Sequence, residues 1–544
     1  MANKKRDLRV RMTTVRTIER FTAALPGFAA VSFLSLSSAC TWLGPVSMNS
    51  ANEQSNGHSR YLSRLSDDGR YIAFSSEGDN LVAGDDNGVS DVFVRDVLNE
   101  STIRVSVASG GGQANGRSYL TDISPDGRYV VFFSEADNLV GGDGNGAWDV
   151  FLHDIQGMTT ERVSLGNAGA EGDGDSTRAF VSADGRYVAF ESDAANLVTD
   201  DDNARRDVFV RDRTGSTTTM VSVDSQGSAG NEGSYVCDLT ADGRHVGFHS
   251  FADNLVQAPA TERWVRNVYL HDRDTGTTAI ASTDISGLAS TSGSYGCSLT
   301  ADAQLVAFES ADVFFAGDKE RIQDIYVKDM LSGVLEKVSE GEGGLPATAD
   351  SFQPMLSPDG RYVSFQSVAS NLTADPYSGG VHVYVRDRQN AATMRLSKTG
   401  GNAPVSGRSS LPAVSANGRY VSFLTDSDQL FANDNNAADD ILVRAVHTLT
   451  VDAIVPDQLP IGATTTVTLH GSNFLAGTVP AVNGGNVSNV VIVDESTITL
   501  DVTVPGTTEV GSQDVLALLF APYGPPGEVI KGSSAICSGC VTYF

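Results

Sequence analysis

The chain has 544 residues, 40% hydrophobic and 19% charged, and its 67 acidic residues outnumber 38 basic ones to give a formal net charge of −29. This length allows several domains or one large repeat architecture, and the apolar content is too high for a disordered chain. The negative charge argues against nucleic acid as a partner, because binding to phosphates rests on Lys and Arg.

Residues 1–39 have the layout of a secretory signal peptide. A basic stretch precedes an apolar run over residues 21–36, and small residues lead to Cys40. Cys40 resembles the lipidated cysteine of bacterial lipoproteins, although Ser37 stands where such signals usually carry Leu. Ordinary cleavage after Ala39 is the alternative. We therefore expect an exported protein of the periplasm, outer membrane or cell surface, lipidated at Cys40 and touching the membrane only through that lipid.

A turn motif recurs along the next 400 residues at nearly constant spacing. Its first copy is Asp68-Gly69-Arg70, and the centres of the copies are spaced by 58, 58, 58, 60, 57 and 58 residues. The copies are centred on Gly69, Gly127, Gly185, Gly243, Ala303, Gly360 and Gly418. Each copy carries four strand-like segments, two of them joined by the Asp-Gly turn, a strong hairpin signal. This pattern predicts an all-β fold with a seven-bladed β-propeller over residues 40–447, in which radial stacking buries both faces of each blade.

The spacing also predicts how the ring closes. The fourth strand centres on an apolar residue followed by a small one, as at residues 105–106, and no such pair follows the seventh third strand at 441–444. The same pattern stands alone at residues 46–47, 23 residues before Gly69. We therefore expect residues 45–49 to supply the outer strand of the last blade.

The propeller repeat resembles a known family. Residues 124–130 and 357–363, both SPDGRYV, resemble the repeat of TolB-type, WD40-like (PD40) bacterial propellers. The resemblance spans roughly residues 45–446 and implies a periplasmic or surface propeller used for protein contacts. The separate N-terminal α/β domain of TolB has no counterpart in this sequence.

Residues 448–520 follow a different pattern. The segments 451–456 and 467–474 resemble an IPT/TIG domain, which implies a small immunoglobulin-like β-sandwich that mediates contacts or acts as a spacer. The later segment 497–502 alternates apolar and polar residues like a half-buried strand. We therefore expect a second, smaller β-domain after the propeller.

Two pairs of cysteines lie beyond Cys40. Residues 521–544 are interpreted as a tail rich in Gly, Pro and Ser, which contains Cys537 and Cys540. Because export places these two cysteines in an oxidising compartment, a structural disulfide is favoured over a redox or metal motif. Cys237 and Cys297 occupy equivalent positions in neighbouring copies, where the other copies carry small residues. Packing between blades is the favoured role for this second pair, and a disulfide is the alternative.

The loop between the second and third strands is the candidate metal site. In five of the seven copies it places Asp, Asn or Glu at positions 1, 3 and 7, and such alternating oxygens can supply several of the ligands that calcium needs. The candidate calcium ligands are Asp85, Asn87, Asp91, Asp143, Asn145, Asp149, Asp201, Asn203, Asp207, Asp318, Glu320, Asp324, Asp434, Asn436 and Asp440. The favoured alternative is that these residues form tight turns by bonding nearby backbone. In either case we expect the rim that carries these loops to be the partner surface.

A second charge pattern lies at the ends of the third strands, where an Arg-Asp pair recurs, as at Arg95-Asp96. These strands are expected to end beside the Asp-Gly-Arg turns, on the rim opposite to the acidic loops. We interpret the pairs as surface ion pairs rather than as a substrate site.

Catalysis is not expected. The sequence lacks the Gly-x-Ser-x-Gly elbow of prolyl-oligopeptidase-type hydrolases, and the residues after the propeller are too few for their hydrolase domain. The sequence predicts a non-catalytic binding or scaffold protein that requires no cofactor, with calcium as the one candidate, and that contacts an envelope or surface protein or glycan. The alternative is a propeller-type hydrolase or lyase acting on polysaccharide. A deep funnel lined by convergent Asp, Arg and His from several blades would favour that alternative.

Overall fold

The computed structural model describes residues 43–543 except 258–262, 316–321, 400–404, 432–433, 435, 447–449, 473, 475–477, 495, 509 and 521–530. The predicted signal peptide and Cys40 therefore lie outside the described residues. The described chain is β-structure apart from two short 3-10 turns, η1 (Asn167–Gly169) and η2 (Glu342–Gly344). It contains no helix that is long and apolar enough to span a membrane.

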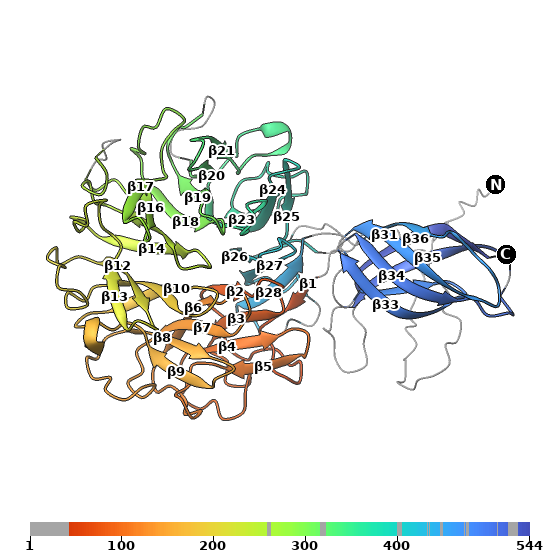
Figure 1. The fold of residues 1–544 in the computed structure, drawn as a ribbon, viewed down its shortest axis with the longest axis horizontal. Helices are drawn as coiled ribbons and strands as arrows, with labels where there is room; N and C mark the ends of the chain where they lie inside the picture. Colours follow the sequence, from red (N-terminus) through yellow and green to blue (C-terminus); the bar gives the residue numbers. More distant parts are fainter. Residues whose placement is uncertain are drawn as a thin grey trace, which may run out of the picture.

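Residues 43–446 form seven four-stranded antiparallel sheets in the described part of the chain, numbered here 1 to 7 in chain order. Sheets 1 to 4 comprise β2 (Ser63–Leu65), β3 (Tyr71–Ser76), β4 (Asp91–Asp96), β5 (Ser101–Arg104); β6 (Ser118–Ile123), β7 (Tyr129–Ser134), β8 (Asp149–Asp154), β9 (Thr159–Arg162); β10 (Ser176–Val181), β11 (Tyr187–Ser192), β12 (Asp207–Asp212), β13 (Thr217–Met220); β14 (Ser234–Leu239), β15 (His245–Ser250), β16 (Asn267–Asp272) and β17 (Thr277–Ile280). Sheets 5 to 7 comprise β18 (Ser294–Leu299), β19 (Leu305–Ser310), β20 (Asp324–Asp329), β21 (Leu335–Lys337); β22 (Ser351–Leu356), β23 (Tyr362–Ser367), β24 (His382–Asp387), β25 (Ala392–Arg395); β26 (Ser409–Val414), β27 (Tyr420–Thr425), β28 (Asp440–Ala445) and β1 (Leu43–Pro45). Figure 1 shows these sheets arranged around a central axis, as the predicted β-propeller requires.

The middle strands of each sheet are buried on both faces. In β4, for example, Val92, Phe93 and Val94 are all at most 2% exposed, although neighbouring side chains point to opposite faces. Apolar clusters fill the spaces between successive sheets, which explains why these strands read as nearly continuous hydrophobic runs.

The N-terminal strand completes sheet 7. β1 pairs antiparallel with β28, with Leu43 opposite Arg444 and Pro45 opposite Leu442. The hydroxyl groups of Ser63 in sheet 1 and Ser422 in sheet 7 lie 2.8 Å apart. The first and last sheets are therefore in contact, and the two ends of the propeller segment meet in one sheet, as the strand spacing predicts. The predicted bounds 45–49 are wrong, because the strand itself is Leu43–Pro45. The apolar–small pair follows the outer strand instead of centring it: Val105-Ser106 comes directly after β5, where the Val105 amide and the Ser106 hydroxyl bond to the neighbouring strand.

The Asp-Gly-Arg-Tyr motif makes both a turn and a contact between sheets. In sheet 2 the Asp126 carboxylate accepts hydrogen bonds from the Ser124 hydroxyl (2.6 Å) and the Arg128 amide (3.0 Å). Gly127 has φ 74°, and a Cβ placed on it would lie 2.3 Å from the ring of Tyr71 in sheet 1. Glycine is therefore required here twice, for the left-handed backbone and for the close approach of the neighbouring tyrosine.

The C-terminal region forms two further four-stranded sheets around its own core. One contains β29 (Thr450–Val455), β31 (Thr464–Ser472), β34 (Thr497–Thr503) and β33 (Asn486–Asp494), and the other β30 (Gln458–Leu459), β36 (Lys531–Tyr543), β35 (Gly511–Phe520) and β32 (Thr478–Val482). The interpretation of residues 521–544 as a tail is wrong, because β36 pairs with both β35 and β30. Its final residues Val541 and Tyr543 are fully buried, whereas the small residues before them concealed the strand pattern. Cys537 and Cys540 lie in β36, and their side chains fall outside the described residues.

Cys237 in β14 and Cys297 in β18 form a disulfide between sheets 4 and 5, with their Cα atoms 5.2 Å apart. The favoured interpretation of packing alone is therefore wrong, and the alternative holds. Inner strands of neighbouring sheets converge toward the axis, which brings equivalent positions within the Cα separation that a disulfide needs.

Candidate functional site

The acidic loops of sheets 1 and 2 already hold a cation supplied by the chain. In sheet 2 Arg162 Nη1 lies 3.2 Å from both Asp143 Oδ1 and Asp149 Oδ2, and 2.6 Å from Glu171 Oε1. In sheet 1 Arg104 takes the equivalent place between two aspartates. The three acids around Arg162 are close enough to one another to share a metal ion, but the guanidinium occupies the position between them.

Sheet 5 follows the same arrangement with a lysine. Lys337 Nζ lies 2.7 Å from Asp324 Oδ2, and both side chains are buried. The other two predicted ligands of this loop, Asp318 and Glu320, lie outside the described residues. Arg104, Arg162 and Lys337 all come from the last residue of the outer strand, so one repeat position neutralises three loops.

Hydrogen bonds inside these loops follow the turn interpretation. In sheet 1 the Asn87 side chain accepts from the Val89 amide (3.0 Å) and donates to Asp91 Oδ2 (2.8 Å). The other oxygen of Asp91 accepts from the Ser106 hydroxyl at 2.5 Å. In sheet 2, Asn145 donates in the same way to Asp149, so the positions chosen as calcium ligands also order the turn themselves.

Sheet 3 lacks the internal cation. Met220 ends its outer strand, where sheets 1 and 2 have arginine. Asp207 is fully buried and accepts from Ser222 (2.6 Å) and Asn203 (2.7 Å), while Asp201 Oδ1 is buried without a hydrogen-bond partner among the described residues. Burial raises the pKa of Asp207 to about 7. This loop therefore has two carboxylates and no cation of the chain beside them.

Sheet 7 joins its two acids with a neutral amide. Gln54 Nε2 donates to Asp434 Oδ1 (2.9 Å) and to Asp440 Oδ2 (2.8 Å). Asn436, the third predicted ligand, donates to the Ser55 carbonyl and so joins the loop to the N-terminal link. Calcium at the five loops stays a prediction. Among the loops whose predicted ligands are all described, that of sheet 3 has no chain cation or amide between its two acids.

At the opposite rim the recurring Arg-Asp pair divides into two roles. Asp96 binds Arg70 of the turn through two hydrogen bonds of 3.0 and 2.7 Å, and the same contact recurs in sheets 2, 3, 4 and 6. Arg95, by contrast, is fully buried and donates to the Asn49 carbonyl, the Glu100 carbonyl and the Thr102 hydroxyl. The interpretation as surface ion pairs is therefore wrong for the arginine, which fastens the preceding link to the strand.

The structure brings a further cluster together near the axis, on the side of the acidic loops. Its first half is aromatic and comes from sheets 1 and 2: Tyr61 contacts Tyr119 (ring centroids 5.2 Å apart) and Phe133 (5.8 Å), and Trp148 contacts both of these partners. Trp148 lies in the acidic loop of sheet 2, directly before Asp149, which places the cluster on that face. Tyr61 is 44% exposed, so one edge of this aromatic wall faces solvent.

The second half of the cluster comes from sheets 3 to 5 and combines rings with charges. The Arg266 guanidinium lies 4.3 Å from the ring centre of Phe251, 4.9 Å from Tyr295 and 5.2 Å from Tyr235. His249 stacks on Tyr235 with centroids 5.3 Å apart. These contacts are close enough for cation–π attraction and for ring stacking.

Arg178 lies between the two halves. It forms the bulge in β10, where the register shifts, and its φ of 25° is a strained value for a residue with a side chain. Burial raises the pKa of Tyr61 in sheet 1 and of Glu309 in sheet 5 and lowers that of His249 in sheet 4; the charge of Arg178 opposes the first two shifts and adds to the third. Arg178 is therefore close enough to interact with side chains of sheets 1, 4 and 5.

Burial shifts the pKa of three titratable groups of this axial cluster, of which Glu191 and His249 are buried and Glu309 is half-buried. Burial raises the pKa of Glu191, although Arg178 and Arg206 oppose the rise, and Glu191 Oε1 accepts from Arg206 at 3.1 Å. Burial raises the pKa of Glu309 to about 7 and lowers that of His249 well below its usual value. His249 is therefore neutral at pH 7, and Glu309 keeps its proton to a higher pH than an exposed glutamate does.

Below the axial cluster, side chains cross the axis. Arg64 of sheet 1 lies 3.8 Å from Asp122 of sheet 2 and 6.0 Å from the ring of Phe180 of sheet 3. Burial raises the pKa of Asp122 to about 7 and that of Asp238 in sheet 4 to about 6. Arg64, Asp122 and Asp238 thus form a charged layer on the inner strands of sheets 1, 2 and 4.

The repeat pattern does not reveal the axial cluster, because the residues of the cluster occupy repeat positions at which the residue type varies from copy to copy. Arg178 occupies a position that is Leu62, Leu120 or Val236 in other copies. Glu191, His249 and Glu309 share another such position, which is Phe133 in sheet 2. A search for departures from the repeat, rather than for its constant residues, would have found these positions.

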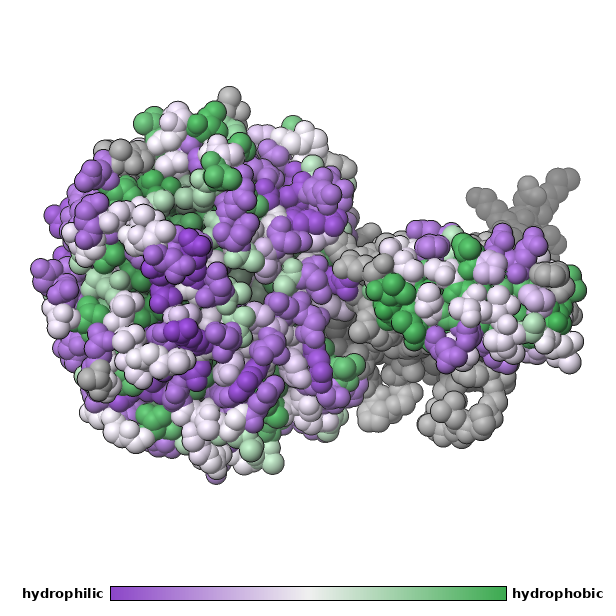
Figure 2. Space-filling model, viewed as in Figure 1, coloured by the Kyte–Doolittle hydropathy of each residue, from purple (hydrophilic) through white to green (hydrophobic). Residues whose placement is uncertain are grey.

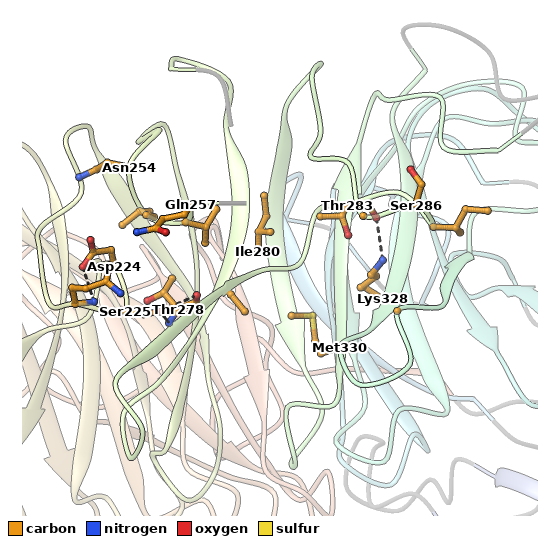
Figure 3. A pocket seen from close by; sticks show the side chains of 17 residues that line it. Asp224, Ser225, Asn254, Gln257, Thr278, Ile280, Thr283, Ser286, Lys328 and Met330 are labelled. Atoms are coloured by element: carbon orange, nitrogen blue, oxygen red, sulfur yellow. Dashed lines mark hydrogen bonds between the residues drawn. The ribbon is translucent and has the colours of Figure 1, made fainter. Parts of the chain in front are cut away.

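The described surface also contains an outer groove between sheets 4 and 5. This pocket, of about 820 Å³, is lined by Thr278 and Ile280 on one side and by Lys328 and Met330 on the other (Figure 3). Lys328 takes the place of the buried Arg95 of sheet 1, and its Nζ donates to the Thr283 carbonyl at 3.4 Å. Figure 2 shows that hydrophilic side chains cover most of the propeller surface in view.

No protein-family model matches the chain, and no curated protein matches it. Among solved structures the chain is similar to a TolB from Agrobacterium tumefaciens (16% identity, TM-score 0.35, covering 65% of this chain and 96% of that one). It is also similar to the RRP9 WD40 repeats, with 10% identity and a TM-score of 0.38 over 75% of this chain and 99% of that one. A third similar structure is the Kuenenia stuttgartiensis hydrazine synthase, with 11% identity and a TM-score of 0.35 over 70% of this chain and 96% of that one.

Proposed function

We propose that this protein is an exported, non-catalytic binding protein whose ligand or partner docks on the propeller face that carries the axial cluster. The single observation that supports this proposal is the convergence of aromatic and charged side chains from five sheets on one end of the axis. Binding sites combine apolar walls with a few placed polar groups, and this cluster has both.

The proposal includes the architecture predicted from the sequence: seven blades closed by the N-terminal strand, then an immunoglobulin-like module of the IPT/TIG type. It also includes export and lipidation at Cys40. Cys40 stands three residues before β1, so a lipid there would hold the outer strand of sheet 7 within about 10 Å of the bilayer surface. Envelope and surface proteins or glycans are the partners within reach of such an anchor.

Cross-linking in the producing cells tests the proposed face. A photo-reactive amino acid at Gln353, which is exposed beside the axial cluster, is expected to capture a partner. The same amino acid at Asp274, exposed on the opposite rim, serves as the matched control and is expected to capture none. Equal capture at both sites, or capture only at Asp274, would contradict the proposal.

A hydrolase or lyase acting on polysaccharide is the second candidate, because Arg178, Glu191, His249 and Glu309 converge from sheets 3, 4 and 5. A buried carboxyl with a raised pKa suits a general acid. Binding remains the first proposal because Glu191 already bonds Arg206 and Thr177, and Glu309 accepts from the Gln353 amide at 2.5 Å. Release of reducing ends or unsaturated products from acidic polysaccharides, abolished in E309Q, would favour the enzyme instead.

A further inference from the structure

We infer that the axial cluster binds a saccharide unit that carries a single carboxylate, as a uronic acid does. This inference rests on the proposed binding function and names the ligand of the same face. Three features of the cluster lead to it: unpaired cations, unpaired buried acceptors and an exposed aromatic wall.

The unpaired cations are Arg178 and Arg266. Neither side chain makes a hydrogen bond or a close ion pair with another described residue, and Arg266 Nε is buried without a hydrogen-bond partner in the described chain. Glu191 and Glu309 interact with Arg178 through charge alone. Both are half-buried, and Arg266 lies among three aromatic rings. A half-buried guanidinium with no anion in hydrogen-bond contact can still bind one, so an anionic group on a ligand would stabilise both.

The unpaired acceptors are Glu191 Oε2 and His249 Nδ1. Both atoms are buried without a hydrogen-bond partner in the described chain, and both side chains are 6% exposed. Because His249 is neutral, Nδ1 can accept a hydrogen bond in the tautomer that carries its proton on Nε2. A ligand that carries O–H or N–H donors beside its anion would match these acceptors better than sulfate or a fatty acid.

The aromatic wall of Tyr61, Tyr119 and Trp148 offers an apolar surface with polar edges. The C–H face of a pyranose ring packs on such a surface while its hydroxyls remain free for hydrogen bonding. Glu191 and Glu309 stand beside the arginines, so a group with one negative charge is repelled less than a phosphate with two. A sugar carboxylate combines the single charge, the donors and the ring face.

Calorimetric titration of the full mature chain tests the assignment at low salt with a trimer of galacturonic acid and a neutral galactose trimer. We expect the acidic trimer to bind at least ten times more tightly than the neutral one. In R178Q the acidic trimer should lose at least ten-fold in affinity. R205Q, which removes an exposed arginine of the acidic loop of sheet 3, is the matched control and should leave the affinity unchanged.

A second variant separates the ring contact from folding. Y61A is expected to weaken both trimers several-fold and Y61F to restore them, with the melting temperature of each variant measured alongside. Equal affinity for the two trimers, unchanged binding by R178Q, or no binding of either trimer by the folded protein would overturn the saccharide assignment. Tighter binding of a nucleoside monophosphate than of the galacturonic acid trimer would also overturn the saccharide assignment. The cross-linking at Gln353 is independent of these titrations. If it captures a protein partner while neither trimer binds, the proposed binding face stands and the saccharide assignment is refuted.

Discussion

The acidic loops of sheets 2 and 3 share one pattern of oxygen ligands but differ in what neutralises them. In sheet 2 Arg162 lies among three carboxylates, whereas in sheet 3 the same strand position is Met220 and two carboxylates remain without a chain cation beside them. One repeated motif therefore gives an internal ion-pair network in sheet 2, whereas in sheet 3 it gives two carboxylates with no described Arg or Lys beside them. The loop residues alone do not decide whether a loop needs a metal, because the deciding residue is on another strand.

Removing the internal cation should have the largest effect. R162M leaves Asp143, Asp149 and Glu171 facing one another without a guanidinium, and loss of one partner from a buried ion network costs about 3–5 kcal/mol of unfolding free energy. We expect a large fall in the melting temperature with a chelator present, and partial recovery in millimolar calcium. Calorimetric melting curves of wild type and R162M with EDTA or calcium measure both effects. A variant that melts like the wild type in EDTA would show that Arg162 does not neutralise the loop.

The converse substitution tests the loop of sheet 3. If calcium occupies the wild-type loop, it adds about 2.7 kcal/mol of stability at a concentration one hundred times its dissociation constant. M220R places a guanidinium where sheets 1 and 2 have one, so it should raise stability in EDTA and abolish the calcium response. D201N should also abolish that response without supplying a cation. An identical wild-type melting temperature in EDTA and in calcium would remove calcium from this loop.

The two loops should also differ in their dependence on pH. The pKa of Asp207 is raised to about 7 in the fold, so ionising it destabilises the fold as pH rises from about 4 through 7. In calcium-free buffer D207N should therefore flatten the fall in unfolding free energy between pH 5 and pH 8. Denaturant titrations across this range compare D207N with the wild type. A fall as steep in D207N as in the wild type would assign it to other groups, such as Asp122.

The opposite rim should show the smallest effect, because its ion pairs face solvent. The side-chain hydrogen bond from Arg128 lowers the pKa of Asp154 to about 2, so the stability from this pair is present above about pH 4 and is lost as pH falls toward 2. D154N should cost about 1 kcal/mol or less at pH 7 and less than that at pH 2, where the carboxyl is partly protonated in the fold. Urea unfolding at both pH values measures the difference. A larger cost of D154N at pH 2 than at pH 7 would contradict the expected loss of this pair's stability at low pH.

The sequence by itself determined the repeating part of this protein. Turns such as Asp126-Gly127-Arg128 depend on local backbone geometry, and alternating or continuous apolar strands report burial directly, so the spacing of copies predicted the four-stranded sheets. The spacing of the Val46-Ser47 pattern also predicted that β1 closes sheet 7. These features are carried by residues close in sequence or by a constant period.

Only the tertiary structure decided which charges meet. Arg162 neutralises the loop of sheet 2 from a neighbouring strand, Cys237 reaches Cys297 across two sheets, and β36 joins its sheet through pairing with β35 and β30. The axial cluster is the clearest case, because Arg178, His249 and Glu309 come from three sheets and meet only when the ring places their strands around one axis. Convergence of this kind depends on distances between chain segments more than 50 residues apart, which neither composition nor periodicity contains.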